Sequence, residues 1–254
     1  MNHPSHQHSD PNQRRARGFT LVELLIVITI IIVLAAVVFS ITQNIRRSAT
    51  KVADMNNLRS LSNAAMAAGS DSAGRLPQIH AGAKNGNSNA APYWLADRET
   101  LEANGIFKES CYAPSKNIYG GAPEYAWWKN YQPGTPVHYC YFGGDGNTPG
   151  DNWFMKGTVV APTKSEYRGN TPFDTIKSDQ SKAFPRNFTD DCWYPVLWSG
   201  LCREYPGSPR VAALMDKGEA LGVNVMFLDG HTEWIPKAKL KKRYSGSGGL
   251  QIYW

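Results

Sequence analysis

A single acidic residue near the start of a long apolar run most constrains this chain. Residues 19–41 give about 23 positions in which Glu23 is the only ionisable side chain. As a helix this run would span roughly 34 Å, enough to cross a bilayer core of about 30 Å. An intramembrane acid costs about 2.5–3.5 kcal/mol at the helix centre and less near an end. We therefore expect Glu23 to have a positive partner at the same depth.

The segment around Glu23 resembles the processing site of type IV prepilins, a family that includes the type II secretion pseudopilins. The resemblance rests on Gly18, Phe19 and Glu23 and covers about the first fifty residues. It implies that a prepilin peptidase cleaves after Gly18 and N-methylates Phe19. The Phe19 ammonium of a neighbouring subunit would then be the partner of Glu23 during assembly. The alternative role of Glu23 is an acid near a helix start that the helix dipole favours.

Residues 1–18 are predicted to be a polar leader peptide. They have no apolar face with which to fold, although their histidines could instead form a metal-binding tract; these are His3, His6 and His8. Three arginines precede the apolar run and favour a cytoplasmic N-terminus. The resemblance implies a single-pass protein of the inner membrane with a periplasmic head, found later in a periplasmic or cell-surface filament.

The chain lacks Gly and Pro between Gly18 and Gly69, which permits one helix of about 50 residues. Residues 19–41 are its transmembrane or filament-core part, and residues 42–68 are its amphipathic part. Apolar residues recur about every 3.4 positions, as on a helix with one buried stripe: Ile41, Ile45, Ala49, Val52, Met55, Leu58, Leu61, Ala65 and Ala68. The opposite face carries polar residues: Arg46, Arg47, Lys51, Asp54, Asn57 and Arg59.

The rest of the chain predicts an antiparallel head. Residues 69–92 are a linker or loop, and 93–254 form the exported head, with a short helix within 94–107 that buries Leu95, Leu101 and Ile106. Frequent Gly and Pro separate short aromatic runs at 137–142 and 193–198, which suits short strands and long loops. Residues 223–235 form a hairpin around Asp229-Gly230, with its inner face on the helix. The expected fold class is α+β, a long N-terminal helix packed on a β-sheet head.

The end of the chain also resembles a bacterial class of prepilin-like proteins with large heads. Their C-terminal segments share an Asn-Val-x-Phe-x-Asp-Gly-His pattern, present here at residues 224–231. Members of that class often have a His ten residues before the aspartate, where this chain has Glu219. Residues 245–249 are predicted to be a flexible joint before the apolar end, Leu250–Trp254.

Four cysteines lie in the head, which suggests disulfides in an exported, loop-rich domain. Three pairings are open; we favour Cys192–Cys202, which closes a short loop, and Cys111–Cys140. A zinc site with His138 is the alternative, but no C-x-x-C spacing occurs. No cofactor is expected, except that Asp145, Asn147 and Asp151 form a weak calcium candidate.

Several other groups could carry chemistry or binding. Asp229 and His231 could form a catalytic pair, but a turn Asp usually bonds its own backbone. A basic run could contact DNA phosphates, acidic lipid or polysaccharide, or it could simply be a solvated face: Lys237, Lys239, Lys241, Lys242 and Arg243. Aromatic residues could stack on sugars or form the core: Trp127, Trp128, Tyr139, Tyr141, Trp193, Tyr194 and Trp198. The net charge of +6 falls to about +4 without the leader, which does not by itself indicate nucleic acid.

These patterns together favour a structural subunit over an enzyme. The resemblance implies a pilus-like or type II secretion pseudopilus filament, built from pilin-like subunits by an inner-membrane assembly platform. The membrane holds the subunit before assembly. The alternative is a membrane-anchored extracytoplasmic module that binds carbohydrate or a surface polymer and does not polymerise. We identify no nucleophile triad, phosphate loop or supported pair of acids that would indicate an enzyme.

Overall fold

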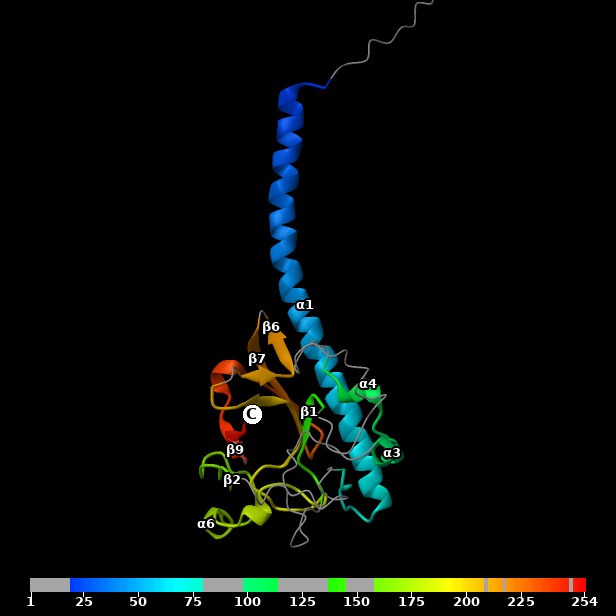
Figure 1. The fold of residues 1–254 in the computed structure, drawn as a ribbon, viewed down its shortest axis with the longest axis vertical. Coiled ribbons are helices and arrows are strands. Elements are labelled where there is room, and N and C mark those ends of the chain that lie inside the picture. Colours follow the sequence, from blue (N-terminus) through cyan, green and yellow to red (C-terminus); the bar gives the residue numbers. More distant parts are fainter. Residues whose placement is uncertain are drawn as a thin grey trace, which may run out of the picture. The chain divides into compact units, whose positions relative to one another are not determined.

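The computed structural model describes residues 19–79, 98–113, 137–144, 158–207, 210–216, 218–246 and 249–254. The chain divides into an N-terminal unit, Met1–Arg47, and a second unit, Ser48–Trp254, which we call the head. Helix α1 (Leu21–Asp71) contributes its first part to the N-terminal unit and its second part to the head (Figure 1). Its 51 residues confirm the long helix that the absence of Gly and Pro predicted.

In the N-terminal unit, α1 has no polar face. The large apolar side chains between Leu21 and Phe39 are 44–87% exposed around the helix. The hydroxyls of Thr29 and Thr42 donate to the carbonyls of Leu25 and Val38 within the helix, so they need no outside partner. By length and composition this part of α1 could cross a membrane. A helix that is apolar all round is stable where lipid or other helices cover it.

In the head, α1 buries one stripe of side chains. It consists of Asp54, Leu58, Leu61, Ser62, Ala65 and Gly69. The predicted stripe was wrong at its start, because Val52 is 51% exposed and Asp54, assigned to the polar face, is completely buried. Gly69 is buried because the ring of Phe188 lies against it; a Cβ there would come within 2.7 Å of that ring.

The first sheet lies against α1 and consists of five antiparallel strands: β1 (Tyr139–Tyr141), β3 (Val196–Gly200), β6 (Leu214–Asp216), β7 (Glu219–Phe227) and β8 (Thr232–Pro236). The order is β1-β3-β7-β6, and β8 pairs with β7. Strands β7 and β8 confirm the predicted hairpin, with Val223 opposite Ile235. The side of β7 that carries Asn224 faces α1, since Asn224 bonds to Asp54.

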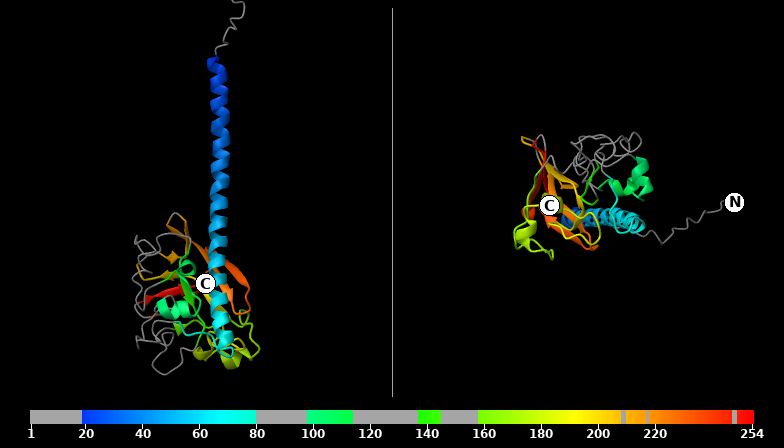
Figure 2. Two further views of the ribbon diagram at one scale, coloured as in Figure 1. Left: turned by 90° about the vertical axis from the view of Figure 1, so that its right-hand side faces the viewer. Right: turned by 90° about the horizontal axis from the view of Figure 1, so that it is seen from below.

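The second sheet has the order β2-β9-β10-β4-β5. Its strands are β2 (Thr158–Val159), β4 (Cys202–Glu204), β5 (Val211–Ala212), β9 (Lys242–Ser245) and β10 (Gln251–Tyr253). The apolar end of the chain is β10, which pairs with β4 and β9 and buries Ile252 completely. Strands β4 and β5 lie close to β7, so one hydrophobic core joins both sheets and α1 (Figure 2).

Short helices complete the described head: α3 (Arg98–Ala103), α4 (Lys108–Cys111), α6 (Phe173–Ile176), and the 3-10 turns η2 (Gln180–Lys182) and η3 (Lys237–Lys239). Helix α3 confirms the short helix, with Leu101 and Ile106 fully buried; Leu95 lies outside the described residues. Of the predicted linker or loop, residues 72–79 contain no helix or strand, and they bury Leu76 and Ile79; residues 80–92 lie outside the described residues. The arrangement confirms the α+β class.

Candidate functional site

The start of α1 is a capping box built from Thr20 and Glu23. The backbone N–H and the hydroxyl of Thr20 both donate to Glu23 Oε2, at 2.9 Å each. The Glu23 N–H in turn donates to Thr20 Oγ1 at 3.2 Å. This reciprocal pattern satisfies backbone groups that the first turn of a helix leaves without partners. Glu23 therefore has a local structural role within its own chain.

That local role leaves part of the Glu23 carboxylate available. Both side-chain bonds go to Oε2, and no described residue donates to Oε1. Phe19, four positions earlier, is 78% exposed. Gly18, the residue before the predicted cleavage, lies outside the described residues. The two described residues of the predicted assembly site are thus both accessible to another molecule.

Inside the head, α1 is joined to the first sheet through a buried carboxylate. Asp54 has no exposed surface. Its Oδ1 accepts from the Tyr139 hydroxyl of β1 at 2.8 Å, and its Oδ2 accepts from Asn224 Nδ2 of β7 at 2.7 Å. Asn57, one helical turn later, donates to the Tyr139 oxygen at 3.2 Å. We call Asp54, Asn57, Tyr139 and Asn224 the buried polar cluster.

Burial dominates the electrostatics of this cluster. It raises the pKa of Asp54 to about 6, although the hydrogen bonds from Asn224 and Tyr139 act in the opposite direction. Sequence reasoning missed the cluster. The one signal that could have revealed it is Asn224, an amide inside an otherwise apolar strand, since a buried amide requires hydrogen-bond partners.

The predicted disulfides are absent. None of Cys111, Cys140, Cys192 and Cys202 is bonded to another, and all four are buried. Cys192 and Cys202 lie on either side of the five-residue strand β3 in the chain. Cys111 lies beside Tyr139, whose side chain faces α1, whereas Cys140 points to the opposite side of the strand.

Most aromatic candidates belong to the core. Tyr139, Tyr141 and Trp198 are fully buried, and Trp193 and Tyr194 nearly so. Of the two predicted roles, these rings therefore have the second: they form part of the core and are not open to stack on a sugar. Trp127 and Trp128 lie outside the described residues, as do the calcium candidates Asp145, Asn147 and Asp151. In the described part of the chain, no three His, Cys, Asp or Glu side chains are grouped to hold a metal ion.

Asp229 and His231 form the turn of the β7–β8 hairpin. Asp229 Oδ1 accepts from the His231 N–H at 3.1 Å and also contacts His231 Nδ1. Gly230 has φ +87°, which suits glycine. The carboxylate therefore stabilises its own turn, as turn aspartates usually do. Glu219 begins β7 and Asp229 follows its end, so a nine-residue strand separates them by roughly 26 Å.

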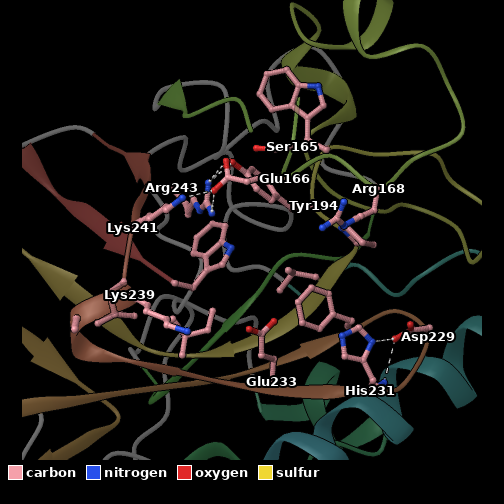
Figure 3. A pocket seen from close by; sticks show the side chains of 18 residues that line it. Ser165, Glu166, Arg168, Tyr194, Asp229, His231, Glu233, Lys239, Lys241 and Arg243 are labelled. Carbon is pink, nitrogen blue, oxygen red and sulfur yellow. Dashed lines mark hydrogen bonds and ion pairs between the residues drawn. The ribbon is translucent and has the colours of Figure 1, made fainter. Parts of the chain in front are cut away.

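The hairpin turn is one end of a groove on the head, with a volume of about 870 Å³ (Figure 3). Glu166 lies at the other end, where it bonds Lys241 at 2.6 Å and Arg243 at 2.9 Å. The hydrogen bond from Arg243 holds the pKa of Glu166 well below its usual range. Lys237 pairs with Glu219 at 2.7 Å. Three cations of the predicted basic run, Lys237, Lys241 and Arg243, are thus paired with two carboxylates of the head.

Comparison with known proteins identifies only the start of the chain. Residues 13–39 match the family model described as the prokaryotic N-terminal methylation motif. No curated protein and no solved structure matches the chain. The motif belongs to a structural class of proteins rather than to an enzyme class, and it is followed here by a long apolar helix. The chain therefore carries the prokaryotic N-terminal methylation motif, followed by a long apolar helix, and this N-terminal segment is consistent with the type IV pilin and pseudopilin family.

Proposed function

We propose that this protein is a structural subunit of a type IV pilus-like or type II secretion pseudopilus filament. A prepilin peptidase cleaves between Gly18 and Phe19 and methylates Phe19. Before assembly the subunit crosses the inner membrane once, with its N-terminus in the cytoplasm and its head in the periplasm. An inner-membrane platform then transfers the helix from lipid into a bundle of sister helices.

The observation that carries the proposal is the position of Glu23 in α1. It is an acid at the start of the segment Leu21–Phe39 of α1, in which the other large side chains are apolar and exposed. Burying a charge without a partner is costly, so side-by-side packing of such helices requires a cation at the depth of Glu23. The new ammonium of Phe19 in a neighbouring subunit supplies it. The unoccupied Oε1 accepts that ammonium while Oε2 retains its bonds to Thr20.

The apolar surface supports the same proposal. Helices leaving a bilayer lose lipid contacts, and close packing against other helices replaces them. The first part of α1 has apolar side chains on every side, so it can meet several neighbours at once. The proposed role requires no catalytic residue in the head.

The test separates the two roles of Glu23. Glu23→Gln keeps the capping geometry, since Gln also serves at this position of a capping box, but removes the charge. Thr20→Val removes the cap and keeps the charge. In the native host, we expect the Gln variant to be processed and stable yet missing from sheared filaments, whereas the Val variant assembles. Mass spectrometry of the mature N-terminus reports processing, and immunoblots of the filament fraction report assembly.

Two results would contradict the proposal. Filaments that contain Glu23→Gln at the wild-type level would exclude the charge pair. A mature protein that still begins at Met1 would exclude processing. A permanently anchored binding module, the alternative function, predicts that neither substitution changes assembly, because no assembly occurs.

A further inference from the structure

The groove on the head is lined by charged side chains that lie apart from one another, and its floor contains aromatic rings that are nearly buried. The lining comes from the segment around Glu166, the start of β3, the β7–β8 hairpin and the η3–β9 segment. Figure 3 shows Arg168 and Lys239 on opposite sides of it, with Glu233 between them. A volume of about 870 Å³ is within the range of small-ligand sites.

Two tryptophan rings of its floor are almost completely covered. Trp193 and Trp254 line the groove but are only 3% and 4% exposed, so they present edges rather than an open pocket. Peptide and protein partners commonly bind through apolar or aromatic anchors placed in such pockets. Neither ring is open to such an anchor, whereas the exposed charged side chains of the lining can bind a ligand through directed hydrogen bonds.

Three charged side chains are available for that purpose. Arg168, Glu233 and Lys239 are exposed and make no ion pair with any described residue. The paired charges, by contrast, lie at the two ends, with Glu166 holding Lys241 and Arg243 at one end and Asp229 contacting His231 at the other. The groove therefore has slightly more cationic than anionic side chains, and carboxylates that can accept hydrogen bonds lie among the cations.

We propose that this groove binds an acidic saccharide. Its acidic groups accept charge-assisted hydrogen bonds from Arg168 and Lys239, and its hydroxyls donate to Glu233. His231 offers a flat face for a sugar ring, because its imidazole stacks on Phe227 at 4.2 Å and 7° and its side chain is 56% exposed. The proposal goes beyond filament formation and does not depend on it.

The mixture of charges favours a saccharide over nucleic acid. A phosphate backbone would bring one negative charge per nucleotide past Glu233 and Asp229. A saccharide carries, beside its acidic groups, several hydroxyls on each ring that both donate and accept. It can therefore satisfy the carboxylate and the cations of the groove together.

The experiment is titration calorimetry on the full-length protein in detergent. The probes are a galacturonic acid hexamer, a sulfated galactose hexamer, the neutral galactose hexamer and hexa-aspartate. We expect one or both acidic saccharides to bind at least about tenfold more tightly than the neutral hexamer and hexa-aspartate. The carboxylated and sulfated probes identify which acidic group is recognised.

The variants assign the binding to this groove. Arg168→Ala combined with Lys239→Ala should weaken the acidic saccharide at least about tenfold, because two charged donors are lost. Lys242→Ala, from the same basic run but outside the groove lining, should bind as the wild type does. All three side chains are exposed, and unchanged near-UV circular dichroism verifies folding. Equal binding of all four probes, no binding of either acidic saccharide, or normal binding by the double variant would overturn the proposal.

Discussion

The two parts of α1 share one backbone geometry but differ in what covers their side chains. Between Leu21 and Arg47 the large apolar residues are exposed on all sides. Between Ser48 and Asp71 a single stripe is buried, and it includes the carboxylate of Asp54. Apolar residues of one helix can thus serve two purposes: packing inside the same chain and contact with other molecules. The second part is stabilised within its own chain, whereas the first part requires other molecules.

The largest difference should appear when one apolar side chain is truncated in each part. Leu61→Ala should lower the free energy of unfolding of the head by about 2–5 kcal/mol, because Leu61 is 1% exposed and leaves a cavity. Ile32→Ala, at a residue that is 64% exposed, should change it by less than about 0.5 kcal/mol. Urea unfolding in detergent, followed by Trp fluorescence, measures both. Similar losses would mean that the two parts are not stabilised differently.

The buried polar cluster makes the second part of α1 sensitive to pH. The pKa of Asp54 is about 6 in the folded head, above the value of 3.8 for an unperturbed Asp, so folding favours the protonated acid. The contribution of Asp54 to stability is therefore greatest below pH 4 and falls by about 3 kcal/mol as pH rises through 6. Asp54→Asn keeps one of the two acceptor oxygens, replaces the other with an amide NH2 group, and removes the titrating acid, so it should remove this fall. Urea unfolding at a series of pH values tests it, and parallel profiles for the two proteins would contradict it.

The capping box should have a local effect in the first part. Thr20→Val removes the two hydrogen bonds between the Thr20 hydroxyl and Glu23, leaves the one from the Thr20 backbone N–H, and should destabilise the first turn by about 1 kcal/mol. Amide hydrogen exchange should then be about fivefold faster in that turn, with no change in the unfolding of the head. Unaltered exchange there would show that the cap does not hold the helix end.

The smallest effect concerns an exposed contact of the second part. Lys51 lies over the ring of Trp234 in β8, with its ammonium 4.2 Å from the ring centroid. Lys51→Met keeps the apolar stem and should cost about 0.5 kcal/mol through the lost cation–π contact. Arg59→Met, at an exposed residue of the same helix, is the matched control and should cost less. Thermal unfolding resolves the two.

Sequence patterns determined the features that depend on neighbours along the chain. The lack of Gly and Pro predicted the length of α1, and the Asp229-Gly230 turn predicted the β7–β8 hairpin, since backbone conformation is a local property. The motif at Gly18, Phe19 and Glu23 is also a pattern of near neighbours in the chain, so the sequence alone indicated the resemblance to type IV prepilins.

Only the tertiary structure decided which face of α1 is buried, what Asp54 contacts and which charges line the groove. Asp54 looked like a solvated residue because its donors, Tyr139 and Asn224, are 85 and 170 positions away in the chain. The cysteines, likewise, could not be paired from spacing, because β3 separates two that are near in sequence. Burial and hydrogen bonding depend on distance in space, which the order of residues alone does not specify.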